Sequence, residues 1–201
     1  MKVLALDTSS AEASVAVWQD GTILAASRFE APRGRGAELF TVLGDLRDSW
    51  RGLDRLAVGI GPGSYNGLRV ACAVAGSFQL ALGCDVVCLP SVCLLDVEDE
   101  HYFVTGDARG ARAYWAEVRG RRVVGTIALL DAVALTKQLA AARASVYRIG
   151  TLSGAESLPA KAPDAEVLAR LARDLTPSAP EDISPIYLKP PHITQPRAVR
   201  P

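Results

Sequence analysis

The opening of the chain alternates short apolar runs with polar turns. Residues 3–6 are continuously apolar and lead into Asp7, and residues 13–18 combine β-branched and aromatic side chains. A turn over residues 19–21 then leads to a further apolar run over residues 22–26. Apolar runs joined by tight polar turns pair as neighbouring antiparallel strands. The pattern therefore predicts a three-stranded antiparallel meander.

The hydrophobic period changes after this meander. Apolar residues at 39, 42, 43 and 46 have the spacing of an amphipathic helix, predicted over residues 37–49. A strand over 55–60 precedes a glycine-rich segment, a helix rich in small residues follows over 68–82, and a strand covers 85–89. The first half of the chain therefore has the order βββαβαβ, an antiparallel opening followed by crossover connections.

The second half repeats this order in reduced form. Strands are predicted over residues 102–106, 113–118, 122–124 and 145–149, with helices over 128–142 and 164–175. The proline-rich tail from Thr176 cannot be regular structure throughout. We therefore predict an α/β protein of two lobes, residues 1–100 and 101–201, each a mixed sheet flanked by helices, with the tail packing back on the first lobe.

Composition limits the classes of function. The 201 residues include 22 basic and 22 acidic side chains, so no global positive charge attracts nucleic acid. The chain contains no apolar run long enough to span a bilayer, which favours a cytoplasmic protein. None of the four cysteines forms a C-x-x-C pair, so no metal site is expected.

The glycine-rich segment after residue 59 is the first candidate site. Glycines allow a backbone to approach a ligand closely, and the helix that follows offers free N–H groups to an anion. The segment lacks the Gly-Lys-Ser/Thr ending of a phosphate-binding P-loop. A nucleotide loop and a tight strand-to-helix connection without a ligand both remain open. The residues concerned are Gly61, Gly63, Ser64 and Gly67.

The end of the first strand is the second candidate. Asp7, Thr8 and Ser9 could position hydrated Mg²⁺ and nucleotide phosphates. They could equally cap their own turn through side-chain hydrogen bonds. His101 and His192 are the only histidines. The sequence therefore offers few residues for a histidine-containing metal site or a Ser-His-Asp triad, and we expect no catalytic residue.

These motifs together resemble the TsaB (YeaZ) family. Residues 4–9 (LALDTS) resemble the family's LAIDTS opening, and residues 58–69 (VGIGPGSYNGLR) closely resemble its VGxGPGSFTGLR segment. Residues 107–116 are similar to its DARxGEVYWA segment, although the resemblance is thin after residue 90. It implies the actin-like ATPase (ASKHA, ribonuclease H-like) superfold.

The resemblance also implies a function and partners. Family members are non-catalytic subunits that support the catalytic subunit TsaD, together with the ATPase TsaE. The complex forms N6-threonylcarbamoyladenosine beside the anticodon of ANN-decoding tRNAs, so this chain would meet tRNA only indirectly. The chain itself would require no cofactor, whereas the complex uses ATP and Mg²⁺. Whether a nucleotide binds at the subunit interface stays an open question.

A dimerisation surface is implied as well. Family members often form homodimers through helices of the first lobe, and small side chains let two such helices pack closely. The implied interface residues are Leu39, Val42, Leu43, Leu46, Leu68, Ala71, Cys72, Ala75 and Phe78.

The chain departs from the family pattern at Gly36, Asn66 and Arg112. These departures leave a divergent paralogue as an alternative. A second alternative is an autonomous ATPase or kinase of the same superfold that uses Asp7 and the glycine loop.

Overall fold

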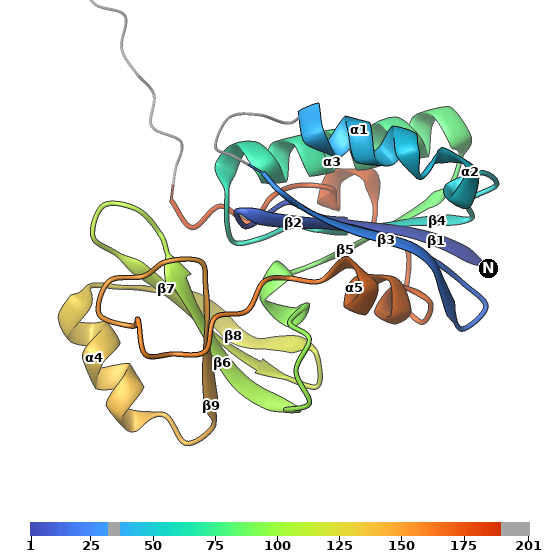
Figure 1. Cartoon of the computed structure of the whole chain (residues 1–201). Coiled ribbons are helices and arrows are strands. Elements are labelled where there is room, and N and C mark those ends of the chain that lie inside the picture. The colour runs from blue at the N-terminus through green and yellow to red at the C-terminus, as the bar shows by residue number, and fades with distance from the viewer. Residues whose placement is uncertain (32–36, 190–201) are drawn as a thin grey trace, which may run out of the picture.

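The computed structural model describes residues 1–31 and 37–189, which form two α/β lobes (Figure 1). The first sheet has five strands in the order β3-β2-β1-β4-β5, and the second has four in the order β8-β7-β6-β9. In each sheet an antiparallel meander precedes strands that add in parallel. The strands of the first sheet are β1 (Lys2–Asp7), β2 (Glu12–Gln19), β3 (Thr22–Glu30), β4 (Arg55–Gly59) and β5 (Asp85–Leu89).

Side-chain alternation gives the first sheet two buried faces. Leu4 and Leu6 point to one face, whereas Val3 and Ala5 point to the other, and all four are fully buried. A strand covered on both sides reads as a continuous apolar run, which explains the sequence of β1.

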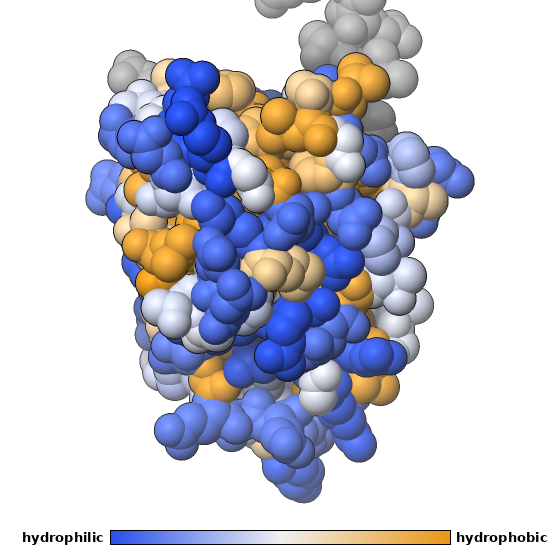
Figure 2. Space-filling view, turned by 90° about the vertical axis from the view of Figure 1, so that its right-hand side faces the viewer, coloured by the Kyte–Doolittle hydropathy of each residue, from blue (hydrophilic) through white to orange (hydrophobic). Residues whose placement is uncertain are grey.

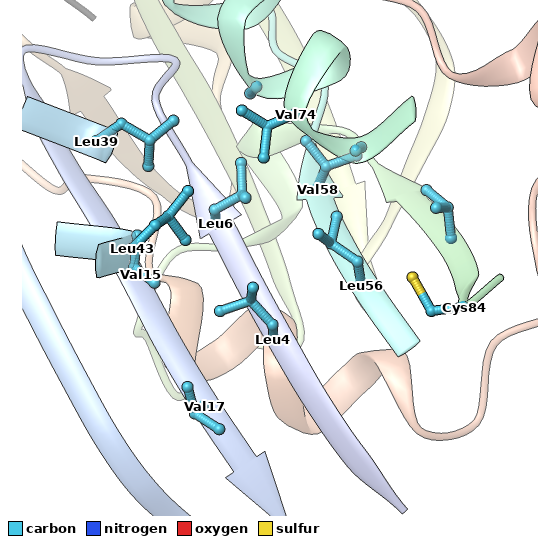
Figure 3. Packing of buried hydrophobic residues seen from close by; sticks show 13 residues of the cluster. Leu4, Leu6, Val15, Val17, Leu39, Leu43, Leu56, Val58, Val74 and Cys84 are labelled. Atoms are coloured by element: carbon cyan, nitrogen blue, oxygen red, sulfur yellow. The ribbon is translucent and has the colours of Figure 1, made fainter. Parts of the chain in front are cut away.

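Three helices cover the first of these faces (Figure 1): α1 (Ala37–Asp45), α2 (Arg47–Trp50) and α3 (Tyr65–Leu82). The predicted helix over 37–49 is interrupted at Leu46. Figure 3 shows Leu39 and Leu43 of α1 and Val74 of α3 directed toward the strand residues of this cluster.

The helix α5 (Ala165–Ala172) covers the opposite face of the first sheet, although its sequence lies within residues 101–201. Its amino end is held because Ser14 on β2 accepts a hydrogen bond from the Ala165 amide at 2.9 Å. At its carboxyl end, the buried Arg55 guanidinium donates to the carbonyls of Ala172 and Leu175, both at 2.7 Å. The predicted second lobe therefore contributes a helix to the first, because α5 covers an apolar face of the first sheet.

The second sheet comprises β6 (His101–Asp107), β7 (Ala113–Arg119), β8 (Arg122–Leu130) and β9 (Ser145–Ile149). The helix α4 (Ala132–Ala141) packs on one face, and the short 3₁₀ helix η1 (Ser91–Cys93) packs on the other. Residues 128–130, predicted as helix, instead pair with β7, and the helix begins after Asp131, whose carboxylate accepts a hydrogen bond from the Ala134 amide. Pairing with β7 overrides the helical propensity of this alanine- and leucine-rich run. A second 3₁₀ helix, η2 (Pro180–Asp182), lies in the tail.

Both meanders turn in the same way. Asp20 and Gly21 in the first sheet, and Gly120 and Arg121 in the second, all have positive φ. Two consecutive left-handed residues form the tight turn whose twist matches that of paired strands. In the described part of the chain, no helix has the length and apolar character needed to cross a membrane.

Candidate functional site

A cleft of about 980 Å³ lies between the two lobes. Its lining comes from six segments: the β1–β2 turn, the end of β3 at residues 30–31, the glycine loop and start of α3, the β6–β7 loop with Tyr114, residues 149–151 after β9, and the tail over residues 186–189. The sequence candidates Ser9, Gly63 and Ser64 are among these lining residues. Both candidate segments of the first lobe therefore meet at one edge of this cleft.

Asp7 is fully buried behind this edge. Its Oδ1 accepts hydrogen bonds from the amide and the hydroxyl of Ser9, at 2.8 and 2.6 Å, and its Oδ2 accepts one from the hydroxyl of Ser91 at 2.6 Å. The Ser91 hydroxyl oxygen in turn accepts a hydrogen bond from the Gly61 amide at 2.8 Å. Asp7 thus joins the β1–β2 turn, η1 and the glycine loop in one network.

The electrostatics of Asp7 follow from this burial. Desolvation raises the pKa of its carboxyl above the ordinary value of 3.8, while the hydrogen bonds from Ser9 and Ser91 act in the opposite direction. Gly59 is required beside it, since a Cβ there would lie 1.8 Å from Asp7 Oδ2. The carboxylate is enclosed by protein atoms and faces no open space in which a hydrated cation would fit.

The glycine loop packs directly against the β1–β2 turn. The Ser64 amide donates to the Ser9 carbonyl at 2.6 Å, and the Thr8 hydroxyl donates to the Gly67 carbonyl at 2.8 Å. A Cβ at Gly63 would lie 2.1 Å from the Ser9 carbonyl oxygen, and one at Gly67 would lie 2.1 Å from that of Thr8. These glycines let two backbones touch, and this accounts for them without a phosphate.

The start of α3 uses its own capping group. Ser64 is the N-cap residue, and its hydroxyl accepts a hydrogen bond from the Gly67 amide at 3.3 Å. The helix begins at Tyr65, three residues before the predicted start, so Asn66 lies exposed in its first turn.

Sequence reasoning missed two residues that complete this site. Ser91 bridges Asp7 and Gly61, and nothing in its sequence context indicates that role. Tyr114 on β7 lines the cleft, and its buried hydroxyl has no hydrogen-bond partner within the part of the chain that the structure describes. Gly106 makes room for it, because a Cβ there would lie 2.5 Å from the Tyr114 hydroxyl oxygen. Burial raises the pKa of Tyr114.

The β6–β7 loop explains one departure from the family pattern. Arg109, Gly110 and Ala111 all have positive φ, and Ala111 occupies the position of the pattern's glycine. A non-glycine residue in this region carries backbone strain. Arg112 contributes its carbonyl to the Ala108 amide at 2.9 Å, so the change of side chain leaves the loop's backbone closure intact. Gly36 and His192 lie outside the described residues.

The implied interface residues lie mostly on the inner sides of α1 and α3. Leu39, Leu43, Leu68, Ala71 and Ala75 are at most 5% exposed within this single chain. Cys72 is also buried, while Val42, Leu46 and Phe78 are partly buried against the same core cluster. Six of the nine side chains are therefore buried within this chain, whereas Val42, Leu46 and Phe78 keep part of their surface exposed.

The outer sides of α1 and α3 carry a different set of residues. Phe40 on α1 is 58% exposed and Leu80 on α3 is 90% exposed, and Ala73 and Ser77 of α3 are exposed as well. Figure 2 shows hydrophobic surface near the top of the molecule, at the height of α1 and α3, above a largely hydrophilic face. Each of the two helices named from the sequence thus has an exposed large apolar side chain, Phe40 on α1 and Leu80 on α3, that the sequence did not single out.

The remaining titratable groups offer no metal site. Among residues 1–31 and 37–189, no group of three His, Cys, Asp or Glu side chains is placed to hold an ion. His101 contacts Glu117 instead, with 3.1 Å between its Nε2 and Glu117 Oε1.

Curated proteins with related sequences share part of this chain. TsaB of Escherichia coli (strain K12), the tRNA threonylcarbamoyladenosine biosynthesis protein, is 32% identical over 130 residues, or 58% of this chain and 54% of that protein. An uncharacterized protein of Mycobacterium leprae (strain TN) is 41% identical over 78 residues, or 36% of this chain and 21% of that protein. The chain therefore matches about half of the first relative's length and about a fifth of the second's.

Solved structures match over a longer span. A Pseudomonas aeruginosa protein described as similar to the peptidase YEAZ has a TM-score of 0.76 at 27% identity, covering 94% of this chain and 99% of that one. YeaZ from Pseudomonas aeruginosa has a TM-score of 0.70 at 26% identity, covering 93% and 99%. The family model described as "TsaD: tRNA N6-adenosine threonylcarbamoyltransferase" matches residues 41–149, a little over half of the chain. The chain belongs to this family and, within it, to the TsaB (YeaZ) proteins with their two-lobed actin-like ATPase fold.

Proposed function

We propose that this chain is a non-catalytic scaffold and dimerisation subunit in the synthesis of N6-threonylcarbamoyladenosine in tRNA. In this proposal it supports the catalytic subunit TsaD, acts together with TsaE, and meets tRNA only through the complex. The observation that carries the proposal is the use of Asp7 and the glycine loop in internal contacts. Because these groups serve the packing of the chain itself, we infer that the chain contributes to tRNA modification by binding its partners.

The proposed partnership also fits the composition of the chain. The sequence contains two histidines, His101 and His192, which lack the close sequence spacing of a metal-binding pair. The zero net charge gives no general attraction to tRNA, so a partner would supply the RNA-binding surface. We place the protein in the cytoplasm with the rest of the modification machinery, as a homodimer when TsaD is absent.

Cofactors belong to the complex in this proposal. ATP and Mg²⁺ serve TsaD and TsaE, and this chain requires neither for its own fold. A nucleotide bound where two subunits meet is compatible with the proposal, because such a site would not need Asp7.

The alternative of an autonomous ATPase or kinase would require Asp7 to reach a metal-bound nucleotide. Both Asp7 oxygens already accept hydrogen bonds from serine side chains, and the residue has no exposed surface. Freeing it would break three hydrogen bonds and leave buried donors without acceptors, which is costly. We therefore favour the scaffold.

The outer surface of α1 and α3 gives the proposal a direct test. Replacing both Phe40 and Leu80 by aspartate should weaken binding to TsaD, and self-association, by about tenfold or more, because two exposed apolar contacts become charges. The thermal unfolding midpoint should stay unchanged, since neither side chain is buried. Co-purification and light scattering measure association.

The matched control is Val133→Asp, which changes a 66% exposed apolar residue on α4 of the second lobe. It should bind TsaD like the parent chain. If the Phe40 and Leu80 variant binds TsaD as tightly as the parent chain, this surface is not the interface. If the parent chain does not bind TsaD at all, the proposed function is wrong.

A further inference from the structure

The chain passes between the two lobes along three segments. The first leads from η1 to β6 and the second leads from β9 back to α5. These two segments lie side by side, because Leu95 and Pro163 form an antiparallel bridge and the Asp164 amide donates to the Leu94 carbonyl at 2.9 Å. Neighbouring connections between two packed bodies are the kind of segment at which hinge motion occurs.

The third passage lies elsewhere, in residues 186–189, on the opposite side of the view from α5 (Figure 1). Before it, the tail is fastened to the first lobe: the Ser178 amide donates to the Val86 carbonyl at 2.7 Å, and Ile183 packs on the α1 and α3 core. The Ile186 amide then donates to the Ile60 carbonyl at 2.8 Å. The tail therefore reaches the cleft from a fixed position on the first lobe.

The next three residues change lobes. The Tyr187 ring packs on Tyr65 at the start of α3, with 5.2 Å between the ring centroids. Leu188 joins the core of the second sheet. The Lys189 ammonium donates to the carbonyls of Ala108 and Arg109, at 2.9 and 2.7 Å. Four consecutive residues thus contact the first lobe at one end and the second at the other.

The contact made by Lys189 is matched to the loop that receives it. Arg109 to Ala111 are consecutive left-handed residues, an arrangement that is unfavourable for non-glycine residues and persists only when surrounding contacts fix it. The lysine supplies a positive charge to two carbonyls at the start of this turn.

We propose that residues 186–189 form a latch that holds the two lobes together across the cleft, opposite the hinge at Leu95 and Pro163. All four residues line the cleft, so release of the latch lets the lobes separate about the hinge and opens access to the buried Tyr114 hydroxyl. Lys189 and Tyr187 hold the latch on the two sides of the gap. This proposal concerns the chain by itself and does not depend on the proposed partner.

A distance measurement between the lobes tests the latch. Spin labels are placed at Glu30→Cys on the first lobe and Thr151→Cys on the second, both exposed cleft-lining positions, with the four native cysteines replaced by alanine. Lys189→Met keeps the aliphatic stem and removes the ammonium. Loss of two charge-assisted hydrogen bonds should raise the population of longer distances by about tenfold. The double variant with Tyr187→Ala should raise it further.

Lys161→Met is the matched control. Its ammonium also donates to a backbone carbonyl, that of Asp96 at 3.0 Å, but on the hinge side. The proposal expects its distance distribution to equal that of the parent. It is overturned if Lys189→Met and the double variant both leave the distribution unchanged, or if Lys161→Met shifts it as much as they do.

Discussion

Gly67→Ala in α3 is expected to lower the free energy of unfolding by about 3 kcal/mol. The same substitution at Gly76, later in this helix, is expected to raise it by about 0.5–1 kcal/mol. Helix propensity favours alanine at both positions. The difference arises because a Cβ at Gly67 would lie 2.1 Å from the Thr8 carbonyl oxygen, whereas nothing lies within 4 Å of one at Gly76. Urea unfolding of the two variants measures both changes.

This pair separates two explanations of the glycine loop. If Gly67 serves the packing of α3 against the β1–β2 turn, its replacement destabilises the protein whether or not a nucleotide is present. A Gly67→Ala variant as stable as the parent chain would show that the close backbone contact contributes little, and our account of the loop would be incorrect.

Asp7→Ala is expected to lower the free energy of unfolding by about 3 kcal/mol, because the amide and hydroxyl of Ser9 and the hydroxyl of Ser91 lose their acceptor. Asp7→Asn keeps an acceptor oxygen and should cost less. Denaturant unfolding across a range of pH values distinguishes the roles of shape and charge.

The expected pH dependence has a definite sign. The pKa of Asp7 in the folded protein is raised above its ordinary value of 3.8. The stabilisation that its protonated form gives is therefore complete below the ordinary pKa, and it is lost as pH rises through the pKa of the folded protein. Asparagine does not titrate, so the Asp7→Asn variant does not lose stability in this way. Its free energy of unfolding relative to that of the parent should therefore increase as pH rises through the pKa of Asp7 in the folded protein. Asp20→Asn is the control with the opposite sign, because the amino-terminal ammonium lowers the pKa of Asp20. Equal pH profiles for the parent and Asp7→Asn would contradict the burial of a titrating carboxyl.

Much of the fold could be predicted from the sequence because its signals are local. The apolar runs of β1 and β2, the turn at Asp20 and Gly21, and the helical period of α1 each depend on neighbouring residues, and the fold has the predicted order of strands in both lobes. The placement of α5 depends on which apolar face lacks a cover, and a local pattern does not contain that information.

The candidate site shows the same division. The sequence brings attention to Asp7 and the glycines, and the structure places them together. Which groups satisfy the carboxylate depends on Ser91, which is separated from Asp7 by most of the first lobe's sequence. The inner and outer sides of α1 and α3 could not be separated either, because small and apolar residues occur on both.

The most direct test of the central claim, that Asp7 is structural and the chain acts by association, is tRNA modification by reconstituted TsaD, TsaE and either the parent chain or Asp7→Asn. Folding and binding of the variant to TsaD are verified first. We predict that the folded, bound variant supports modification to within about twofold of the parent, since the Asp7 carboxylate is buried and its hydrogen bonds come from Ser9 and Ser91. Loss of modification by about a hundredfold or more in a variant that still folds and binds TsaD would contradict the account.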